Sequence, residues 1–381
     1  MTGFEPVSEI SDGLPNALTI NAGSSSLRLA SFVLQSPTVR IAELRLSPPP
    51  LHEPDVLADF IRQYVQVAPN VVIHRVVHGG DSLQQPCVID RWAEEEIERL
   101  EKRAPLHNAI ALAWVRAAKA AFKPDTLQVA CFDTGFFADL PRVASTYALP
   151  KELNETFHLR RYGFHGLAHE SMLGQWCQFC PEFADERLIS LQLGAGCSIA
   201  AIERGRPVDT SMGFSPLEGL MMATRSGDLD PALVLYLIDQ CGFSAKELDR
   251  ILNSSSGLQG VSGESAELQA LLDSKTEAAA LAVEMFCYRV RKYLGAYLAV
   301  LGGAKAILFG GGIGENSQVI RARLLDDFGW ARIRLDPERN NSVDPEYGGS
   351  IHADESGVEL WVTPTDEESI MAEAARSLLA S

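Results

Sequence analysis

The sequence lacks a secretion signal and any apolar stretch long enough to span a membrane. Its first sixteen residues are acidic and polar, with neither the basic start nor the apolar centre of a signal peptide. Basic residues are also few, because 33 Lys and Arg stand against 50 Asp and Glu, a formal net charge of -17. That charge argues against non-specific partners such as nucleic acid or an anionic membrane. We therefore expect a cytoplasmic protein with neither kind of partner.

The cysteines do not form a disulfide framework. They number seven, an odd count, and most lie inside apolar runs. This pattern is typical of buried thiols in a reducing compartment. Cys177 and Cys180 have C-x-x-C spacing, but no second pair or nearby histidine pair accompanies them. Packing is therefore favoured over zinc or redox chemistry for this pair.

The two familiar glycine signatures for nucleotides are absent as well. Residues 307–317 read I-L-F-G-G-G-I-G-E-N-S, in which Glu315 breaks the G-x-G-x-x-G pattern, and no G-x-x-x-x-G-K-[ST] occurs. The segment nevertheless predicts a strand, a glycine-rich turn and then a helix over 319–328. A turn that leads into a helix N-terminus is a common place to bind nucleotide phosphates.

Strand and helix patterns alternate along the chain, which favours an α/β fold. Its 381 residues, 46% of them hydrophobic, suffice for two domains, with a boundary expected at residues 150/151. We predict strands at 71–77, 128–132, 188–193, 199–202 and 306–309, and helices at 91–103, 108–122, 231–239 and 276–301. Residues 46–54 are expected to be a loop. Thr365 and Glu368 have the spacing of a capping box that opens a C-terminal helix to about Leu379.

Residues 17–32 predict a β-hairpin with a polar turn. An apolar run ends at Asn21, Gly23-Ser24-Ser25-Ser26 form the turn, and a second apolar run follows. The turn offers backbone N–H groups and hydroxyls to an anion. An ordinary hairpin turn explains the same residues equally well, because Gly and Ser are common in turns.

Four further segments place polar residues beside tight turns, and each has a plainer alternative. Arg75 lies near the end of a strand that leads into Gly79-Gly80, where a guanidinium can bind a carboxylate or phosphate, or can simply be solvated. Asp133 follows the next strand, as a catalytic acid or a turn-starting residue. His165 lies between two glycines, where a ligand can approach closely. Arg225 precedes Ser226-Gly227 in a dense polar segment.

The histidine pair His165 and His169 lacks the pattern of a zinc site, and Glu367 has a plain structural explanation. His165 and His169 have i, i+4 spacing, but the glutamate and third ligand of a zinc site are missing. Glu367 lies in the first turn of the C-terminal helix, where the helix dipole favours an acid in any case.

Taken together and in order, these segments resemble the acetate kinase family of short-chain acyl kinases. The resemblance extends from the N-A-G-S-S-S turn at residue 21 to T-D-E-E at residue 365. It includes the motifs R-V-V-H-G-G, A-P-L-H-N, F-D-T, R-R-Y-G-F-H-G, D-T-S-M-G-F-S-P-L-E-G and G-G-I-G-E-N-S.

The resemblance implies two ribonuclease-H-like domains of the acetate and sugar kinase/actin superfamily with an interdomain cleft. The C-terminal helix is expected to return to the first domain, so that residues 1–150 with 364–381 form one domain and 151–363 the nucleotide-binding and dimerisation domain. The implied reaction is reversible transfer of phosphate from ATP to a short-chain carboxylate, giving ADP and an acyl phosphate, with Mg²⁺ or Mn²⁺, in a homodimer.

The resemblance also implies a role for each matching residue. The catalytic residues would be Arg75, Asp133, His165 and Arg225, and the metal residues Asn21 and Glu367. The carboxylate site would comprise Val77, Leu106, His107, Phe164 and Pro216. The nucleotide and phosphate site would comprise Ser24, Ser26, Arg28, Gly194, Gly196, Gly312, Ile313, Gly314 and Asn316.

The chain departs from the family pattern at its phosphate end. The usual H-L-G-N-G-A-S reads Q-L-G-A-G-C-S here, with Gln192 for His and Ala195 for Asn, and Arg28 stands where Lys is usual. Gln192 keeps a hydrogen-bond donor without a potential charge, whereas Ala195 loses one. An alternative is therefore a divergent binding or regulatory protein with weak or altered donor use. A sugar kinase is disfavoured by the two arginines and the small apolar pocket.

Overall fold

The structure is a computed structural model that describes residues 14–23, 26–47, 54–65, 67–102 and 105–380. These residues form two compact units. Unit 1 contains the described residues up to Ala138, His165–Leu167 and those from Asp366, and unit 2 contains Asp139–Phe164 and Ala168–Thr365. The domain boundaries expected at 150/151 and 363/364 remain a prediction. Within the described residues, no helix combines the length and apolar character needed to cross a membrane.

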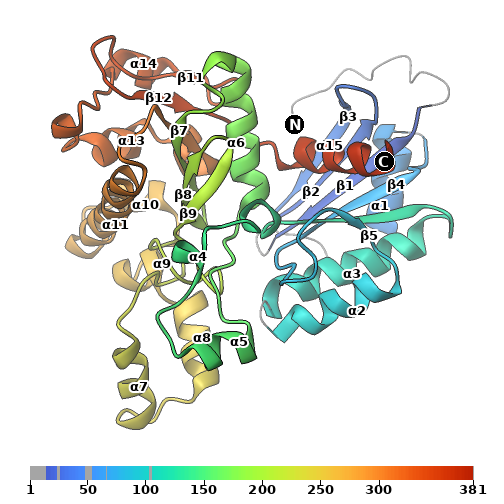
Figure 1. Ribbon diagram of the computed structural model, residues 1–381, viewed down its shortest axis with the longest axis horizontal. Helices are drawn as coiled ribbons and strands as arrows, with labels where there is room; N and C mark the ends of the chain where they lie inside the picture. Colours follow the sequence, from blue (N-terminus) through green and yellow to red (C-terminus); the bar gives the residue numbers. More distant parts are fainter. Residues whose placement is uncertain (1–13, 24–25, 48–53, 66, 103–104, 381) are drawn as a thin grey trace. The chain divides into compact units, whose positions relative to one another are not determined.

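Unit 1 is built on a six-stranded sheet of order β3-β2-β1-β4-β6-β5 (Figure 1). β1, β2 and β3 are antiparallel, β4 and β6 run parallel to β1, and β5 is an antiparallel edge. Its strands are β1 Asn16–Ala22, β2 Leu27–Val33, β3 Val39–Leu46, β4 Val71–Val76, β5 Cys87–Val88 and β6 Leu127–Phe132. Its helices are α1 Pro54–Phe60, α2 Arg91–Arg99, α3 Pro105–Ala121 and α15 Glu367–Ala380.

Unit 2 has a second six-stranded sheet, of order β11-β12-β10-β7-β8-β9. Its strands are β7 Arg187–Leu193, β8 Cys197–Glu203, β9 Arg206–Thr210, β10 Ala306–Gly310, β11 Gly349–Ser350 and β12 Glu359–Val362. Its helices are α4 Arg142–Ser145, α5 Lys151–Phe157, most of α6 Gly166–Phe179, α7 Pro231–Asp239, α8 Ala245–Ser254, α9 Gly257–Ser262, α10 Leu268–Asp273, α11 Glu277–Leu301, α12 Gly311–Asn316, α13 Gln318–Leu325 and α14 Pro337–Ser342.

The two sheets share one topology. In each, three consecutive antiparallel strands are followed by two strands parallel to the first, which gives β3-β2-β1-β4-β6 in unit 1 and β9-β8-β7-β10-β12 in unit 2. Asn21 and Gln192 occupy equivalent places, each one residue before the end of the first strand. No sequence repeat reveals this duplication, because different side chains fill the two sheets.

Side-chain alternation places helices on both faces of the unit 1 sheet. Leu18 and Ile20 of β1 face one side and pack with apolar residues of α1 and α3, including Phe60 and Trp114. Residues of the opposite face pack against α15, whose Met371 is fully buried (Figure 1). Successive side chains of a strand point to opposite faces of the sheet, and helices cover both faces here, so this sheet is buried on both sides.

The predicted hairpin, the five predicted strands and the C-terminal helix are present, with ends shifted by a few residues. β3 was not predicted, and it includes Leu46, the expected start of a loop whose residues 48–53 lie outside the described chain. The prediction of a glycine-rich turn after β10 is wrong, because residues 311–316 form the short helix α12. The capping box is also different, since Asp366 rather than Thr365 accepts a hydrogen bond from Ser369 N.

His169 lies fully buried in α6 between two serines of the unit 2 sheet. Its Nδ1 is 2.6 Å from Ser190 Oγ, and its Nε2 is 2.8 Å from Ser198 Oγ. A neutral imidazole satisfies this arrangement, because one ring nitrogen donates and the other accepts. Burial lowers the pKa of His169 from 6.5 to about 3. This histidine is a structural part of unit 2, in keeping with the expectation that it is no zinc ligand.

We expect the stability that His169 provides to fall in acid. Its pKa is lower in the folded protein, so its contribution is complete above pH 6.5 and is lost as the pH falls towards 3. The loss amounts to about 1.4 kcal/mol per pH unit. His169→Gln should therefore lower the melting temperature more at pH 7.5 than at pH 5. Ser190→Ala, which removes a partner without the titrating ring, should lower it about equally at both. A pH-independent effect of His169→Gln would contradict the assignment.

Candidate functional site

Unit 1 gathers charged side chains at the carboxyl ends of β1, β4 and β6. Arg75 Nε and Nη2 donate to both oxygens of Asp133, with distances of 2.6 to 3.1 Å. Arg75 Nη1 also donates to Asn21 Oδ1 at 3.2 Å. Parallel neighbouring strands end at the same edge of a sheet, which is why residues 54 and 58 positions apart in the sequence meet here.

The N-terminus of α15 adds two carboxylates to this cluster. Asn21 Nδ2 donates to Glu367 Oε2 at 2.6 Å and to Glu368 Oε1 at 2.7 Å. Glu367 Oε2 lies 3.9 Å from Arg75 Nη1, and Glu368 Oε2 lies 3.8 Å from Arg28 Nη1. Both acids lie in the first turn of the helix, where its dipole favours negative charge.

Burial and charge act against one another in this cluster. Burial lowers the pKa of Arg75, but Asp133 and Glu367 outweigh it and raise that pKa above its ordinary value. Burial raises the pKa of Asp133, and the charge of Arg75 opposes the rise. Burial and the neighbouring Glu367 raise the pKa of Glu368. The guanidinium therefore remains charged, and burial makes the carboxyl groups of Asp133 and Glu368 easier to protonate than free carboxyls.

His165 is tied to this cluster through the backbone. It belongs to unit 1 and has a positive φ of 58°, and the next residue, Gly166, donates its N–H to the Asp133 carbonyl at 3.0 Å. Asp133 N in turn donates to the Val76 carbonyl at 3.0 Å. The ends of two strands and the start of α6 are thus fixed to one another.

The oxygen-rich part of the cluster fits a hard divalent cation. Glu367 and Glu368 supply carboxylate oxygens, and Mg²⁺ is usually held by one or two carboxylates together with substrate phosphates. The Asn21 amide oxygen accepts from Arg75 Nη1, and its Nδ2 faces the two carboxylates. Among the described residues, no group of three or more His, Cys, Asp or Glu side chains forms a complete cage. The donor set therefore suits a metal that arrives with its substrate. Glu368 was missed from the sequence, although it follows Glu367 directly.

The structure describes only some of the other residues predicted for the site in unit 1. Val77 is buried just after β4, and Ser26 O accepts a hydrogen bond from Gly23 N at 2.9 Å across the hairpin turn. Ser24 lies outside the described residues, and so do the side chains of Leu106 and His107 in α3. Asn108, which the sequence left unassigned, pairs with the backbone N–H and carbonyl of His78.

Unit 2 brings together the predicted nucleotide glycines. The turn between β7 and β8 contains Gly194 and Gly196, and a Cβ on Gly194 would lie 3.9 Å from Gly312 N. The remaining predicted residues, Ile313, Gly314 and Asn316, belong to α12. Asn316 Nδ2 donates to the Gly312 carbonyl at 2.9 Å.

Two of the residues that depart from the family pattern, Gln192 and Ala195, lie at the same place, whereas Arg28 belongs to unit 1. Gln192 packs on Gly311, where a Cβ would come within 2.8 Å of Gln192 Oε1. That oxygen is buried and has no hydrogen-bond partner among the described residues. Ala195 is exposed, and its carbonyl accepts from Ala223 N at 3.1 Å. Burial raises the pKa of Cys197 to about 12, so its thiol remains protonated 3.1 Å from the Gly194 carbonyl.

Arg225, Pro216 and Phe164 also belong to unit 2. Pro216 and Phe164 are buried. Arg225 Nη1 donates to the Pro216 carbonyl at 3.2 Å. The predicted pair of arginines is therefore divided, with Arg75 in unit 1 and Arg225 in unit 2.

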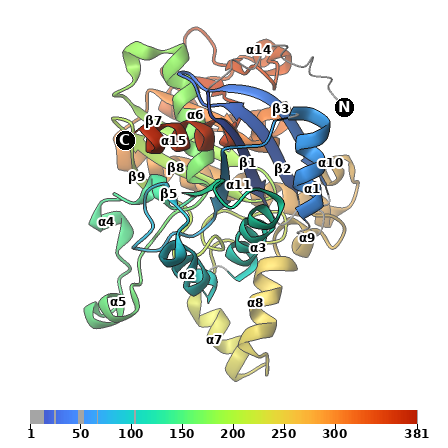
Figure 2. The same cartoon turned by 90° about the vertical axis from the view of Figure 1, so that its right-hand side faces the viewer.

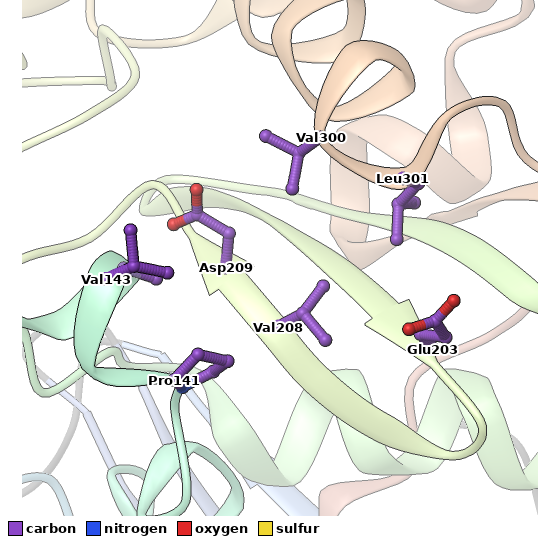
Figure 3. A pocket seen from close by; sticks show the side chains of 8 residues that line it. Pro141, Val143, Glu203, Val208, Asp209, Val300 and Leu301 are labelled. Carbon is purple, nitrogen blue, oxygen red and sulfur yellow. The ribbon is translucent and has the colours of Figure 1, made fainter.

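A hollow of about 290 Å³ in unit 2 contains none of the predicted residues (Figure 3). Val143 and Val208 form part of its apolar wall, and Glu203 and Asp209 add two carboxylates. Burial raises the pKa of Asp209. The hollow lies on the edge strand β9, and we assign it no part in the chemistry.

Comparison with known proteins gives a consistent picture. The sequence model of the acetokinase family matches residues 57–373. Acetate kinase of Chloroherpeton thalassium is 44% identical over 308 residues, covering 80% of this chain and 74% of that protein.

Solved structures agree with the sequence relatives. Porphyromonas gingivalis acetate kinase superposes with a TM-score of 0.84 at 31% identity, covering 96% of this chain and all of that one. A propionate kinase from Francisella tularensis gives 0.85 at 30% identity, covering 95% and 99%. The expected α/β fold of two ribonuclease-H-like domains is confirmed, as is a phosphotransferase that uses a carboxyl acceptor. The chain belongs to the acetokinase family.

Proposed function

We propose that this protein transfers the terminal phosphate of ATP reversibly to a short-chain carboxylate, acetate in the first instance, by direct in-line transfer. The observation that carries the proposal is the buried cluster in which Arg75 binds Asp133 with two parallel contacts beside Asn21 and Glu367. A carboxylate is already a nucleophile, so transfer needs orientation and charge neutralisation more than covalent help.

Each side chain has a defined part in this proposal. Arg75 orients the carboxylate, and Asp133 holds the Arg75 guanidinium in place. His165 and Arg225 donate hydrogen bonds to the transferring phosphoryl group, whose three equatorial oxygens gain charge. Glu367, with Glu368 and Asn21, would hold Mg²⁺ or Mn²⁺, which neutralises phosphate charge when bound.

The acceptor and nucleotide sites complete the assignment. Val77, Leu106, Phe164 and Pro216 would contact the acyl chain, with His107 beside the carboxylate. Phosphates would be contacted by Ser24, Ser26, Arg28 and the turn at 194–196, and the adenine nucleotide by residues 312–316. The free thiols of all seven cysteines agree with a reducing compartment such as the cytoplasm.

The activity can be tested by trapping acyl phosphate with hydroxylamine after incubation with Mg-ATP and acetate, propionate or butyrate. Arg225→Ala should lower the rate by about 10²–10³, because a donor to the developing charge is lost. Asp133→Ala should have an effect at least as large, because it also leaves Arg75 unpaired. Arg91→Ala, whose side chain is 93% exposed, serves as the control and should be unchanged. A folded wild-type protein that forms no hydroxamate with any acid would contradict the proposed function.

The altered phosphate end makes donor choice a separate question. Gln192 leaves a buried oxygen unpaired, and Ala195 contributes no side-chain donor. These observations favour weakened use of ATP, and they keep a binding or regulatory role as the second candidate function.

Restoring the family residues should therefore improve ATP use. Gln192→His with Ala195→Asn should raise kcat/KM for ATP by about tenfold, as one regained hydrogen bond to a charged group would. The KM for acetate should stay the same. Pyrophosphate should be assayed in parallel on both proteins. Equal ATP kinetics in the double variant and wild type would show that these positions do not set donor use.

We further propose a homodimer, supported by helix α7. The sequence of α7, P-A-L-V-L-Y-L-I-D, is strongly apolar, yet none of its residues is buried. Leu235 is 61% and Tyr236 56% exposed, and the helix lies apart from strands β7–β9 of its unit (Figure 1, Figure 2). In a chain of net charge -17, the uncharged residues 231–238 form a surface that can meet a second copy of itself without repulsion.

Leu235→Glu should shift the protein from dimer to monomer in sedimentation velocity, because two like charges would face each other at the two-fold contact. Val143→Glu, at a position 93% exposed on a different helix, is the matched control and should leave the dimer intact. A wild-type monomer, or a Leu235→Glu dimer of unchanged stability, would contradict this interface.

A further inference from the structure

The segment from Ser211 to Leu229 carries two proposed site residues without any regular structure of its own. It connects β9 to α7 and contains neither helix nor strand, yet Pro216 and Arg225 both lie in it. A segment of this length keeps a defined shape only if side chains and backbone groups elsewhere hold it.

The carboxylate of Glu218 is the centre of that support. Arg161 Nη2 donates to Glu218 Oε1 at 2.6 Å, and the Tyr147 hydroxyl donates to Glu218 Oε2. Glu218 folds over Gly213 so closely that a Cβ on Gly213 would lie 1.6 Å from Glu218 Oε2. The glycine is therefore required by the position of this carboxylate.

The two partners of Glu218 also bind the backbone of the segment. The Tyr147 oxygen accepts from Phe214 N at 2.7 Å, and Arg161 Nη1 donates to the Ser211 carbonyl at 3.1 Å. Burial and Glu218 raise the pKa of Tyr147, so its hydroxyl remains protonated and able to donate. Positions 211, 214 and 218 are thereby fixed on either side of Pro216.

A second carboxylate fixes the next residue. Asp228 Oδ1 accepts from Gly219 N at 2.8 Å, and Asp228 Oδ2 accepts from the Tyr293 hydroxyl at 2.7 Å. Pro216 is thus held between anchored neighbours, and its carbonyl is the acceptor for Arg225 Nη1. Any shift of Pro216 would be transmitted to the guanidinium.

We propose that Glu218, held by Tyr147 and Arg161, is a positioning residue that sets both the acyl-chain contact of Pro216 and the orientation of Arg225. This inference rests on the proposed function, since it needs Pro216 and Arg225 to act in it. It means that the choice between carboxylates and the rate of phosphoryl transfer both depend on the contacts of Glu218. Glu218 contacts neither substrate nor phosphoryl group in this role.

The test uses Glu218→Gln and the milder Tyr147→Phe, with Tyr347→Phe at a 71% exposed tyrosine as the control. Both test variants should lower kcat/KM for acetate by about tenfold or more, as expected when a catalytic group is displaced by a fraction of an ångström. The ratio of kcat/KM for propionate to that for acetate should change as well. The KM for ATP should change less than the kinetics for acetate, because neither substitution removes a contact of residues 194–196 or 312–316 and, in the described part of the chain, only the Ala223–Ala195 hydrogen bond joins them to the segment.

Hydrogen exchange followed by mass spectrometry gives a readout that does not depend on turnover. Peptides that contain Phe214 and Gly219 should exchange faster in Tyr147→Phe than in wild type, and no faster in Tyr347→Phe. An active wild type with unchanged propionate-to-acetate ratio and unchanged exchange in Tyr147→Phe would overturn the positioning role. A wild type that forms no acyl phosphate would instead contradict the proposed function, so the two failures are distinguishable.

Discussion

The ion pair between Arg75 and Asp133 is the interaction on which unit 1 depends. Arg75 belongs to β4 and Asp133 directly follows β6. The pair contacts β1 through Asn21, and Asn21 contacts α15 through Glu367 and Glu368. Buried charges are costly unless each has a partner, and removing one partner of such a pair typically costs about 3–5 kcal/mol. The ion pair used in the proposed chemistry therefore also helps to hold four elements together. These are β1, β4, the end of β6 and the start of α15.

Much of this could be predicted from the sequence, for a clear physical reason. Strand β10 is a short apolar run that ends at Gly310, and α11 begins at a Thr cap and ends at Gly302. Local pattern alone specifies such elements. The roles of Arg75, Asp133 and Arg225, by contrast, came from the resemblance to a family, because each has an equally plausible local explanation when taken singly.

The remainder depends on contacts between distant residues, which local pattern does not contain. Glu368 meets Asn21 across 347 positions, and Glu218 meets Tyr147 across 71. The alternation of β3, V-R-I-A-E-L-R-L, is interrupted at Ile41-Ala42, where its pairing with β2 shifts register, and each remaining piece is too short to identify a strand by pattern. The start of α15 shifted because Thr365 is engaged by Glu315, which leaves Asp366 to cap the helix.

The shared topology of the two sheets has a consequence for how such an enzyme can diverge. Asn21 and Gln192 occupy equivalent positions in the two sheets, but Asn21 donates hydrogen bonds to Glu367 and Glu368, whereas Gln192 packs on Gly311. A substitution at one of these two positions therefore leaves the contacts of the other in place. The departures from the family pattern at residues 192, 195 and 197 of unit 2 accordingly leave the Arg75–Asp133 ion pair of unit 1 in place.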